Sequence, residues 1–286
     1  MGSDIRKPLV AGIFYPGDTQ SLRELLLGWG LGAGTAAADA PKKTFRSPFG
    51  VIVPHAGYLY SGRIAARGIG WLAEQGRPER IVILGADHTG IGAAVCTDEH
   101  SAWRTPFGDA PIDRDACERL AAAGVVPDGA AFVREHSIEV VLPFLQAVYG
   151  ATVSFVPIRV GAASASTYAQ LGEALADVVG QHGAVVVSSD FTHYEPEDAA
   201  HRKDRTVLDR ICALDVEGLS DLVANKRPSV CGIPSIMVAL HWAAAVGITQ
   251  GDVLEYATSA DVTGDRSAVV GYAAVGWGRS KERHGS

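Results

Sequence analysis

The chain has 286 residues and a mass of 29.9 kDa, with 47% hydrophobic and 20% charged residues. This composition excludes disorder as the main state, and the length fits one large domain over residues 1–286. A net charge of −7, with basic residues only in short groups, argues against a nucleic-acid-binding surface. Four cysteines in a chain of this length exclude a disulfide scaffold.

Targeting and membrane signals are not visible in the sequence. No apolar segment follows the charged residues Asp4, Arg6 and Lys7, so we expect no secretory signal. The longest apolar run, at 236–248, is too short to span a bilayer. We therefore predict a cytoplasmic protein with no membrane partner, whose oligomeric state the sequence leaves open.

In chain order, a Gly- and Ala-rich stretch at about 31–43 predicts a flexible surface loop. After it, short apolar runs alternate with longer amphipathic stretches. Strands are predicted at 51–53, 81–84, 153–160, 185–187, 253–258 and 268–275. Helices are predicted at 61–74, 113–123, 138–148, 167–179, 195–224 with a break near Leu214, and 232–246. Continuous Val and Ile runs indicate strands buried on both faces, so the pattern predicts a three-layer α/β/α sandwich with a largely parallel or mixed central sheet.

Three of the predicted buried strands lead directly into a histidine. His55 follows the strand at 51–53, His88 follows 81–84, and His193 follows 185–187. Ligands of open α/β sheets bind outside the carboxyl ends of the strands, so we expect the three imidazoles to share one site. The alternative is that each is an ordinary loop residue, in which case the three rings should point apart.

A metal at this site would need anionic donors besides histidine. Four residues close to the histidines in sequence or at element ends offer them: Asp87, Glu135, Asp190 and Cys231. Cys231 immediately precedes the helix predicted from 232, where the helix N-terminal amides are expected to lower the pKa of the thiol. Soft thiolate and imidazole donors together suit a transition metal.

A second polar cluster marks the start of the helix predicted at 138–148. Glu135 and Glu139 flank His136, and Ser137 could cap the helix. The carboxylates either orient a metal ligand or serve only the helix entrance, and the sequence does not decide between these readings.

Several of these residues belong to motifs that occur in a fixed order along the chain. The motifs lie at 11–16, 54–58, 85–88, 104–106, 135–139, 188–193, 231–232 and 264–274. Together they resemble the MEMO family, whose bacterial members include protein B of the AmmeMemoRadiSam system, and the resemblance covers about 8–277. It implies a fold similar to that of the class III extradiol dioxygenases, which are non-haem iron enzymes.

The resemblance also implies roles for individual residues. The metal ligands would be His55, His88 and Cys231, with Cys231 in place of the glutamate of those dioxygenases. His193 would match their acid/base histidine, with Asp190 beside it.

Further side chains are predicted to line the pocket or to support the ligands. They are Tyr15, Tyr58, Asp87, Arg104, Glu135 and His136. The chain departs from many relatives at Thr89, where they carry a second histidine, and this removes one donor from the pocket.

The expected function is that of a metal-binding oxidoreductase, an Fe(II) dioxygenase-like enzyme acting on a small diol or enol. A thiolate ligand is softer than a carboxylate and shifts preference toward copper or zinc, so fold analogy does not settle the chemistry. The alternatives are a non-catalytic copper- or iron-binding or redox protein, a peptide- or phosphopeptide-binding protein that uses the histidines and Arg104, and a zinc hydrolase with His193 as base.

Overall fold

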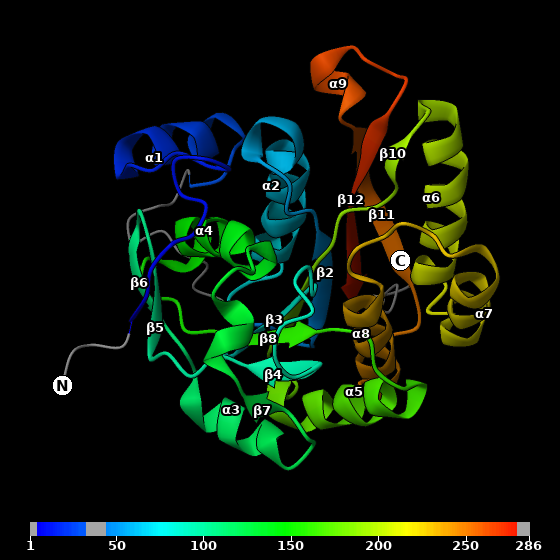
Figure 1. Ribbon diagram of the computed structural model, residues 1–286. Helices are drawn as coiled ribbons and strands as arrows, with labels where there is room; N and C mark the ends of the chain where they lie inside the picture. The colour runs from blue at the N-terminus through cyan, green and yellow to red at the C-terminus, as the bar shows by residue number, and fades with distance from the viewer. Residues whose placement is uncertain (1–4, 33–43, 279–286) are drawn as a thin grey trace, which may run out of the picture.

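A mixed sheet of nine strands runs through the middle of the protein (Figure 1). The computed structural model describes residues 5–32 and 44–278, so the loop predicted at about 31–43 lies outside the described residues from 33 onward. The strand order is β10-β12-β2-β9-β3-β8-β4-β7, and β11 also pairs with β12. The strands are β2 (Phe49–Val53), β3 (Ile81–Gly85), β4 (Val95–Thr97), β7 (Val126–Pro127), β8 (Val156–Val160), β9 (Ala184–Ser188), β10 (His193–Glu195), β11 (Gly251–Thr258) and β12 (Val269–Gly278).

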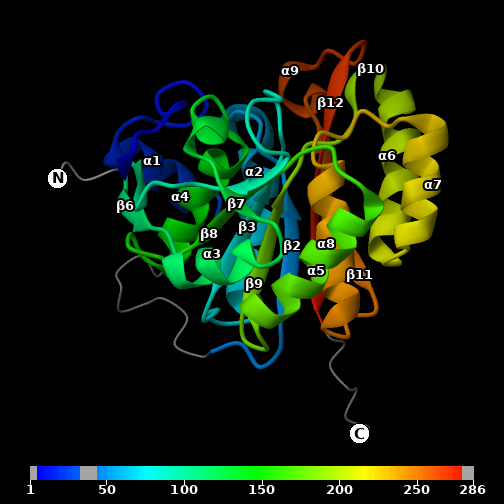
Figure 2. The same cartoon turned by 60° about the horizontal axis from the view of Figure 1, so that its bottom comes forward.

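The four central strands, β2, β9, β3 and β8, are parallel, and antiparallel pairs lie outside them. All residues of β3, β8 and β9 are buried, as the continuous apolar runs predicted. Helices lie on both faces of the sheet (Figures 1 and 2). The predicted α/β fold with a mixed, largely parallel sheet between helices is therefore confirmed.

One face of the sheet carries α2 and α4, with α1 outside them, and the other carries α8, backed by α5, together with α6 and α7 (Figure 2). The helices are α1 (Thr19–Gly28), α2 (Tyr58–Glu74), α3 (Arg114–Ala121), α4 (Ser137–Tyr149), α5 (Ala165–Val179), α6 (Glu197–Cys212), α7 (Val216–Lys226), α8 (Ile233–Ala245) and α9 (Ala260–Thr263). A separate small sheet joins β1 (Ile5–Arg6), β5 (Ala102–Thr105) and β6 (Gly108–Pro111). In the part of the chain that the structure describes, no helix has the length and apolar character needed to cross a membrane.

The predicted long elements are all present, and the break near Leu214 separates α6 from α7. The sequence pattern does not predict α1, α9, the small sheet or the short strands β4, β7 and β10. These strands have only two to four residues, too few for a periodic pattern. For α1 a signal existed, since Asp18 accepts a hydrogen bond from the Ser21 backbone as N-cap and the buried Leu22 and Leu26 are one turn apart.

Two glycines allow the elements around the carboxyl ends of the strands to approach closely. A Cβ on Gly85, the last residue of β3, would lie 2.5 Å from the Ile138 side chain at the start of α4. A Cβ on Gly232, before α8, would lie 2.5 Å from the Ser189 Cβ after β9. Any larger residue would push α4 or the start of α8 away from this edge of the sheet.

Candidate metal centre

The histidines after β2 and β3 meet at the carboxyl edge of the sheet. Both strands pair in parallel with β9, so their carboxyl ends lie side by side. The rings of His55 and His88 have centroids 5.1 Å apart and stand nearly perpendicular to each other. These two imidazoles therefore converge, as the shared-site hypothesis predicted, and do not point apart.

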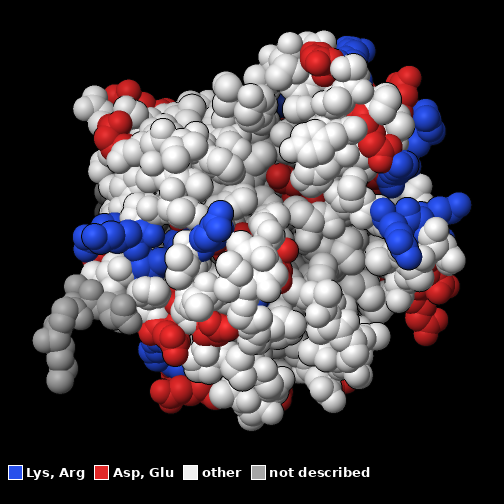
Figure 3. Space-filling view, viewed as in Figure 1, with Lys and Arg blue, Asp and Glu red and all other residues white. Residues whose placement is uncertain are grey.

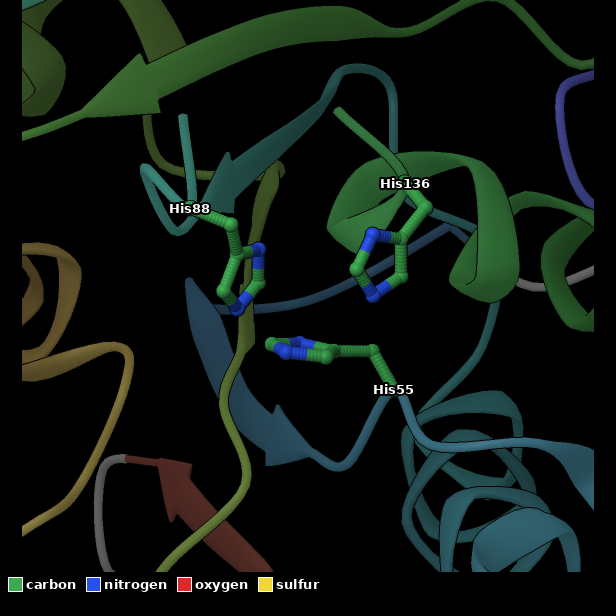
Figure 4. A group of neighbouring side chains, drawn as sticks. All are labelled: His55, His88 and His136. Carbon is green, nitrogen blue, oxygen red and sulfur yellow. The ribbon is translucent and has the colours of Figure 1, made fainter. Parts of the chain in front are cut away.

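His136 joins them from the start of α4. One ligand atom from each of His55, His88 and His136 lies within 4.8 Å of the others, an arrangement that could hold a metal ion. Figure 4 shows the rings of His88 and His136 face to face, with the ring of His55 crossing below them. The sequence predicts His136 only as a residue around the ligands, because no predicted strand leads into it.

Hydrogen bonds determine which nitrogen of His55 is available. The Ser188 hydroxyl donates to the Ser137 carbonyl at 2.7 Å, so its oxygen accepts from Nδ1 of His55 at 2.8 Å. The proton is therefore on Nδ1, and the lone pair of Nε2 faces the site. Burial, with the nearby His88 and His136, holds the pKa of His55 well below its usual range, so this ring is neutral and able to bind a metal.

Glu135 holds the Nδ1 proton of His88. Its carboxylate lies 3.0 Å from Nδ1 of His88 and also accepts from the backbone N–H groups of His88, His136 and Ser137. Burial alone would raise the pKa of Glu135, but the hydrogen bond and charge of His88 and these backbone donors outweigh it and lower the pKa. Burial alone would lower the pKa of His88, but the hydrogen bond and charge of Glu135 outweigh it and raise the pKa, so a bound metal would have to replace a proton on Nε2. A carboxylate behind a ligating histidine is the usual second partner in metal sites, so the structure favours the ligand-orienting reading of Glu135.

Cys231 contacts the group from the other side. Its Sγ lies 3.3 Å from Nε2 of His55 and accepts a hydrogen bond from the Asp190 backbone N–H at 3.1 Å. The predicted lowering of the thiol pKa is wrong. Burial and the neighbouring Asp190 charge raise the pKa of Cys231 despite its place before α8, so a metal ion would be needed to make it a thiolate.

Asp190 lies between β9 and β10, and His193 is the first residue of β10. Nδ1 of His193 donates to the Ser229 carbonyl at 2.7 Å, which leaves Nε2 as the proton acceptor. Asp190 accepts from the His55 backbone N–H at 2.8 Å, and burial raises the pKa of its carboxyl. Tyr194, the residue after His193, has a φ of 58° and is 77% exposed, so the backbone is strained next to His193.

The remaining predicted pocket residues lie further from the cluster. Tyr15 and Tyr58 are buried. Their hydroxyls donate to Glu139 and to the Val140 carbonyl, so both side chains support the first turns of α4. Asp87 accepts from the Arg159 guanidinium at 2.7 Å and from the Thr89 backbone, which shapes the loop that carries His88.

Arg104 does not reach the histidines. Its guanidinium forms a bidentate pair with Asp109 across the small sheet, at 2.7 and 2.9 Å, and is half exposed. The position of Arg104 therefore does not support its predicted role in peptide or phosphopeptide binding.

Comparison with known proteins identifies the family. A family model described as Memo-like protein matches residues 6–276. The chain belongs to this family. A MEMO1 family protein of Methanopyrus kandleri is 45% identical over 278 residues, which cover 94% of this chain and 98% of that protein. A MEMO1 family protein of Methanosarcina acetivorans is 38% identical over 275 residues, covering 95% and 98%.

Among solved structures, an uncharacterized protein of Escherichia coli K12 resembles this Memo-like chain with a TM-score of 0.57 and 15% identity, over 80% of this chain and 99% of that one. At that identity the likeness concerns the fold alone. The family resemblance drawn from the motifs is thus confirmed, whereas the chemistry has to be argued from the site.

Three supporting residues were missed by the sequence analysis. Ser188 and Ser229 orient His55 and His193, and Arg159 holds Asp87. Arg159 carried a signal, because a charged residue within an apolar central strand is rarely buried without a partner. The two serines carried none, since polar residues are common in loops after strands.

Proposed function

We propose that this Memo-like protein binds Fe(II) through His55, His88 and Cys231 and acts as a dioxygenase-like oxidoreductase on a small diol or enol. The observation that carries the proposal is a pair of imidazoles whose Nδ1 atoms are held by Ser188 and Glu135, so that Nε2 of each ring is the atom left for a metal, beside a thiol sulfur 3.3 Å from Nε2 of His55. Two neutral nitrogens and one soft anion on one side of an ion leave other positions open, as in non-haem iron oxygenases.

The donor set fits a transition metal on its own chemistry. Each histidine has its second nitrogen tied to an oxygen, and the sulfur has a backbone N–H donor, as ligands of bound metals commonly do. His136 is less suited as third ligand, because its ring is 16° from parallel with that of His88. Lone pairs lie in the ring plane, so stacked rings direct them side by side and not at one point.

Bound there, Fe(II) would supply Lewis acidity and redox chemistry. The protein residues would handle the protons and the orientation of the substrate. His193, with Nδ1 held by Ser229, would take the substrate hydroxyl proton on Nε2. Asp190 would orient the His55 backbone and, because burial raises the pKa of its carboxyl, could hold a proton close by.

The test is anaerobic loading of tag-free protein with Fe(II), followed by metal analysis and oxygen-uptake measurements with catechols and enols. We expect about one iron per chain and substrate-dependent oxygen uptake, both lost in H88A. H241Q, which changes a histidine outside the cluster, is the matched control and should retain both. Iron binding without oxygen uptake for any diol or enol, or an H88A variant that still binds iron, would overturn the proposal.

A second candidate is a non-catalytic metal-binding protein that uses His55, His88 and His136. It is favoured by one observation, the mutual distance of at most 4.8 Å among ligand atoms of these three residues. It predicts stoichiometric copper, iron or zinc binding that depends on His136 more than on Cys231. Comparing H136Q with C231S in the same metal-binding assay therefore separates the two candidates.

A further inference from the structure

A hollow lined by basic residues lies away from the metal centre, between α6 and β11. Its volume is about 680 Å³, within the range of small-molecule sites. His201, Arg202 and Arg205 line it from α6, and Val253 and Tyr256 line it from β11. Figure 3 shows Lys and Arg side chains, interspersed with acidic ones, on the right side of the molecule, where Figure 1 places α6 and α7.

Two carboxylates lie close to this hollow, because Glu197 is 4.0 Å from His201 and Asp209 is 2.9 Å from Arg205. None of the described residues that line it is acidic. Within residues 5–32 and 44–278, Arg202 has no carboxylate in ion-pair range, and the exposed Arg205 pairs only with the exposed Asp209. Such exposed pairs contribute little, so an anion can compete for Arg205 at small cost.

Helix spacing places the basic groups together. Arg202 and Arg205 are three residues apart, and His201 and Arg205 four apart, so all three project from neighbouring positions of α6. Guanidinium groups bind phosphate oxygens through two parallel N–H donors, which suits them to a phosphate better than to a single carboxylate oxygen.

The opposite wall offers an apolar surface. Tyr256 has its ring centroid 5.1 Å from that of His201, and Val253 is 43% exposed. The Tyr256 hydroxyl is already used, because it donates to buried Asp204 at 2.7 Å. This wall therefore presents ring and aliphatic surface to a ligand, next to the cations of α6.

We propose that the hollow between α6 and β11 binds a phosphate monoester with an aromatic or otherwise flat apolar body. Arg202 and Arg205 hold the phosphate, and the body packs against Tyr256 and Val253. The site is separate from the proposed iron site, and nothing in it requires a metal.

The hollow also lies next to a hydrogen-bond chain that ends beside His193. Tyr256 donates to Asp204, and Asp204 accepts at 2.6 Å from the hydroxyl of Thr192, the residue before His193. A ligand packed against Tyr256 would therefore contact the residue that, through Asp204 and Thr192, supports the segment leading to His193.

The experiment is calorimetric titration of the full chain, without added metal, with phenyl phosphate, inorganic phosphate and phenol at low salt. We expect phenyl phosphate to bind one per chain, more tightly than phosphate, with no measurable binding of phenol. R202A/R205A should weaken phenyl phosphate binding by about 10-fold or more, since charge-assisted hydrogen bonds are lost. R46A/R67A removes two exposed arginines elsewhere and should change it by less than about twofold.

H88A distinguishes the hollow from the histidine cluster and should bind phenyl phosphate as the wild type does. The proposal is overturned if phenyl phosphate does not bind, if phenol binds equally well, or if R202A/R205A binds like the wild type. Equal loss in R46A/R67A, which would indicate a general charge effect, or loss in H88A, which would place the ligand at the histidines, overturns it as well. Thermal unfolding of each variant checks that the fold is intact.

Discussion

The two sides of the histidine cluster are supported by different kinds of interaction. On the α4 side, which comprises His88, Glu135 and His136, the backing is a buried ion pair: Arg6 contacts Glu139 at 2.7 Å and also donates to the Glu135 carbonyl. On the α8 side, which comprises Asp190, His193 and Cys231, no buried ion pair is found among the described residues, and hydroxyl and backbone groups provide the contacts.

The α4 side is therefore the more rigid of the two, and the α8 side is the more exposed. Glu139 and Arg6 are 1% and 5% exposed, so α4 and the N-terminal segment are joined inside the protein. The α8 side instead contains the exposed, left-handed Tyr194 next to His193. Of the proposed iron ligands, His88 lies on the rigid side and Cys231 on the other, whereas His193, the proposed proton acceptor, lies next to the exposed Tyr194.

The largest expected effect tests the ion pair of the α4 side. In E139Q the buried Arg6 charge has no partner. In the wild type the carboxylate of Glu139 accepts hydrogen bonds from the backbone N–H groups of Leu9 and Val10, and the amide N–H of a glutamine would face these donors instead. We expect the free energy of unfolding to fall by about 3–5 kcal/mol, measured by urea denaturation. E74Q, an exposed matched change, should stay within about 0.5 kcal/mol, and a similarly small effect of E139Q would show that the two sides do not differ in this way.

The second prediction concerns the sulfur on the α8 side. C231S keeps the size of the side chain but removes the soft donor, so Fe(II) and Cu(I) affinity should fall by about 100-fold, at the upper end of the losses seen when metal-site partners are removed. Competition with a chelator of known affinity measures it.

H193A is the matched control, since His193 faces Ser229 and lies outside the proposed ligand set. It should retain metal affinity within about threefold while losing oxygen uptake. Unchanged affinity in C231S together with strong loss in H136Q would support the three-histidine centre.

The smallest expected effect concerns Asp204, a buried carboxyl on α6 that accepts from Thr192 next to His193. Burial raises the pKa of Asp204, which accepts hydrogen bonds from hydroxyl and backbone donors and forms no ion pair with any residue that the structure describes. A group whose pKa is higher in the folded state favours folding at acidic pH, and this contribution is lost as the pH rises through the folded-state pKa.

The stability advantage of wild type over D204N should therefore be greatest near pH 4 and should shrink as the pH rises. The change should be on the order of 1 kcal/mol, measured by urea denaturation across this range. An advantage that grows with pH would mean that Asp204 is stabilised as a carboxylate and would contradict the prediction.

Much of the fold could be predicted from local patterns. The buried strands β2, β3 and β9 show as continuous apolar runs because both faces of a central parallel strand are covered by helices. The histidines that follow β2 and β3 could be assigned to one edge for the same reason, because parallel strands end together.

The partners of these histidines could not be predicted in the same way. His136 reaches the cluster only because Gly85 lets the start of α4 pack against β3, a contact between segments about 50 residues apart. The pKa of Cys231 depends on burial and on the charge of Asp190, which outweigh the helix terminus that the sequence makes visible.

The sequence by itself therefore determined the family, the order of strands and helices, and which residues lie at the carboxyl edge of the sheet, because these depend on local pattern and on motif order. Only the tertiary structure decided which nitrogens face one another, that Arg104 is paired elsewhere, and that a basic hollow forms between α6 and β11. Those features depend on distances between residues far apart in the chain, and such distances are set by packing.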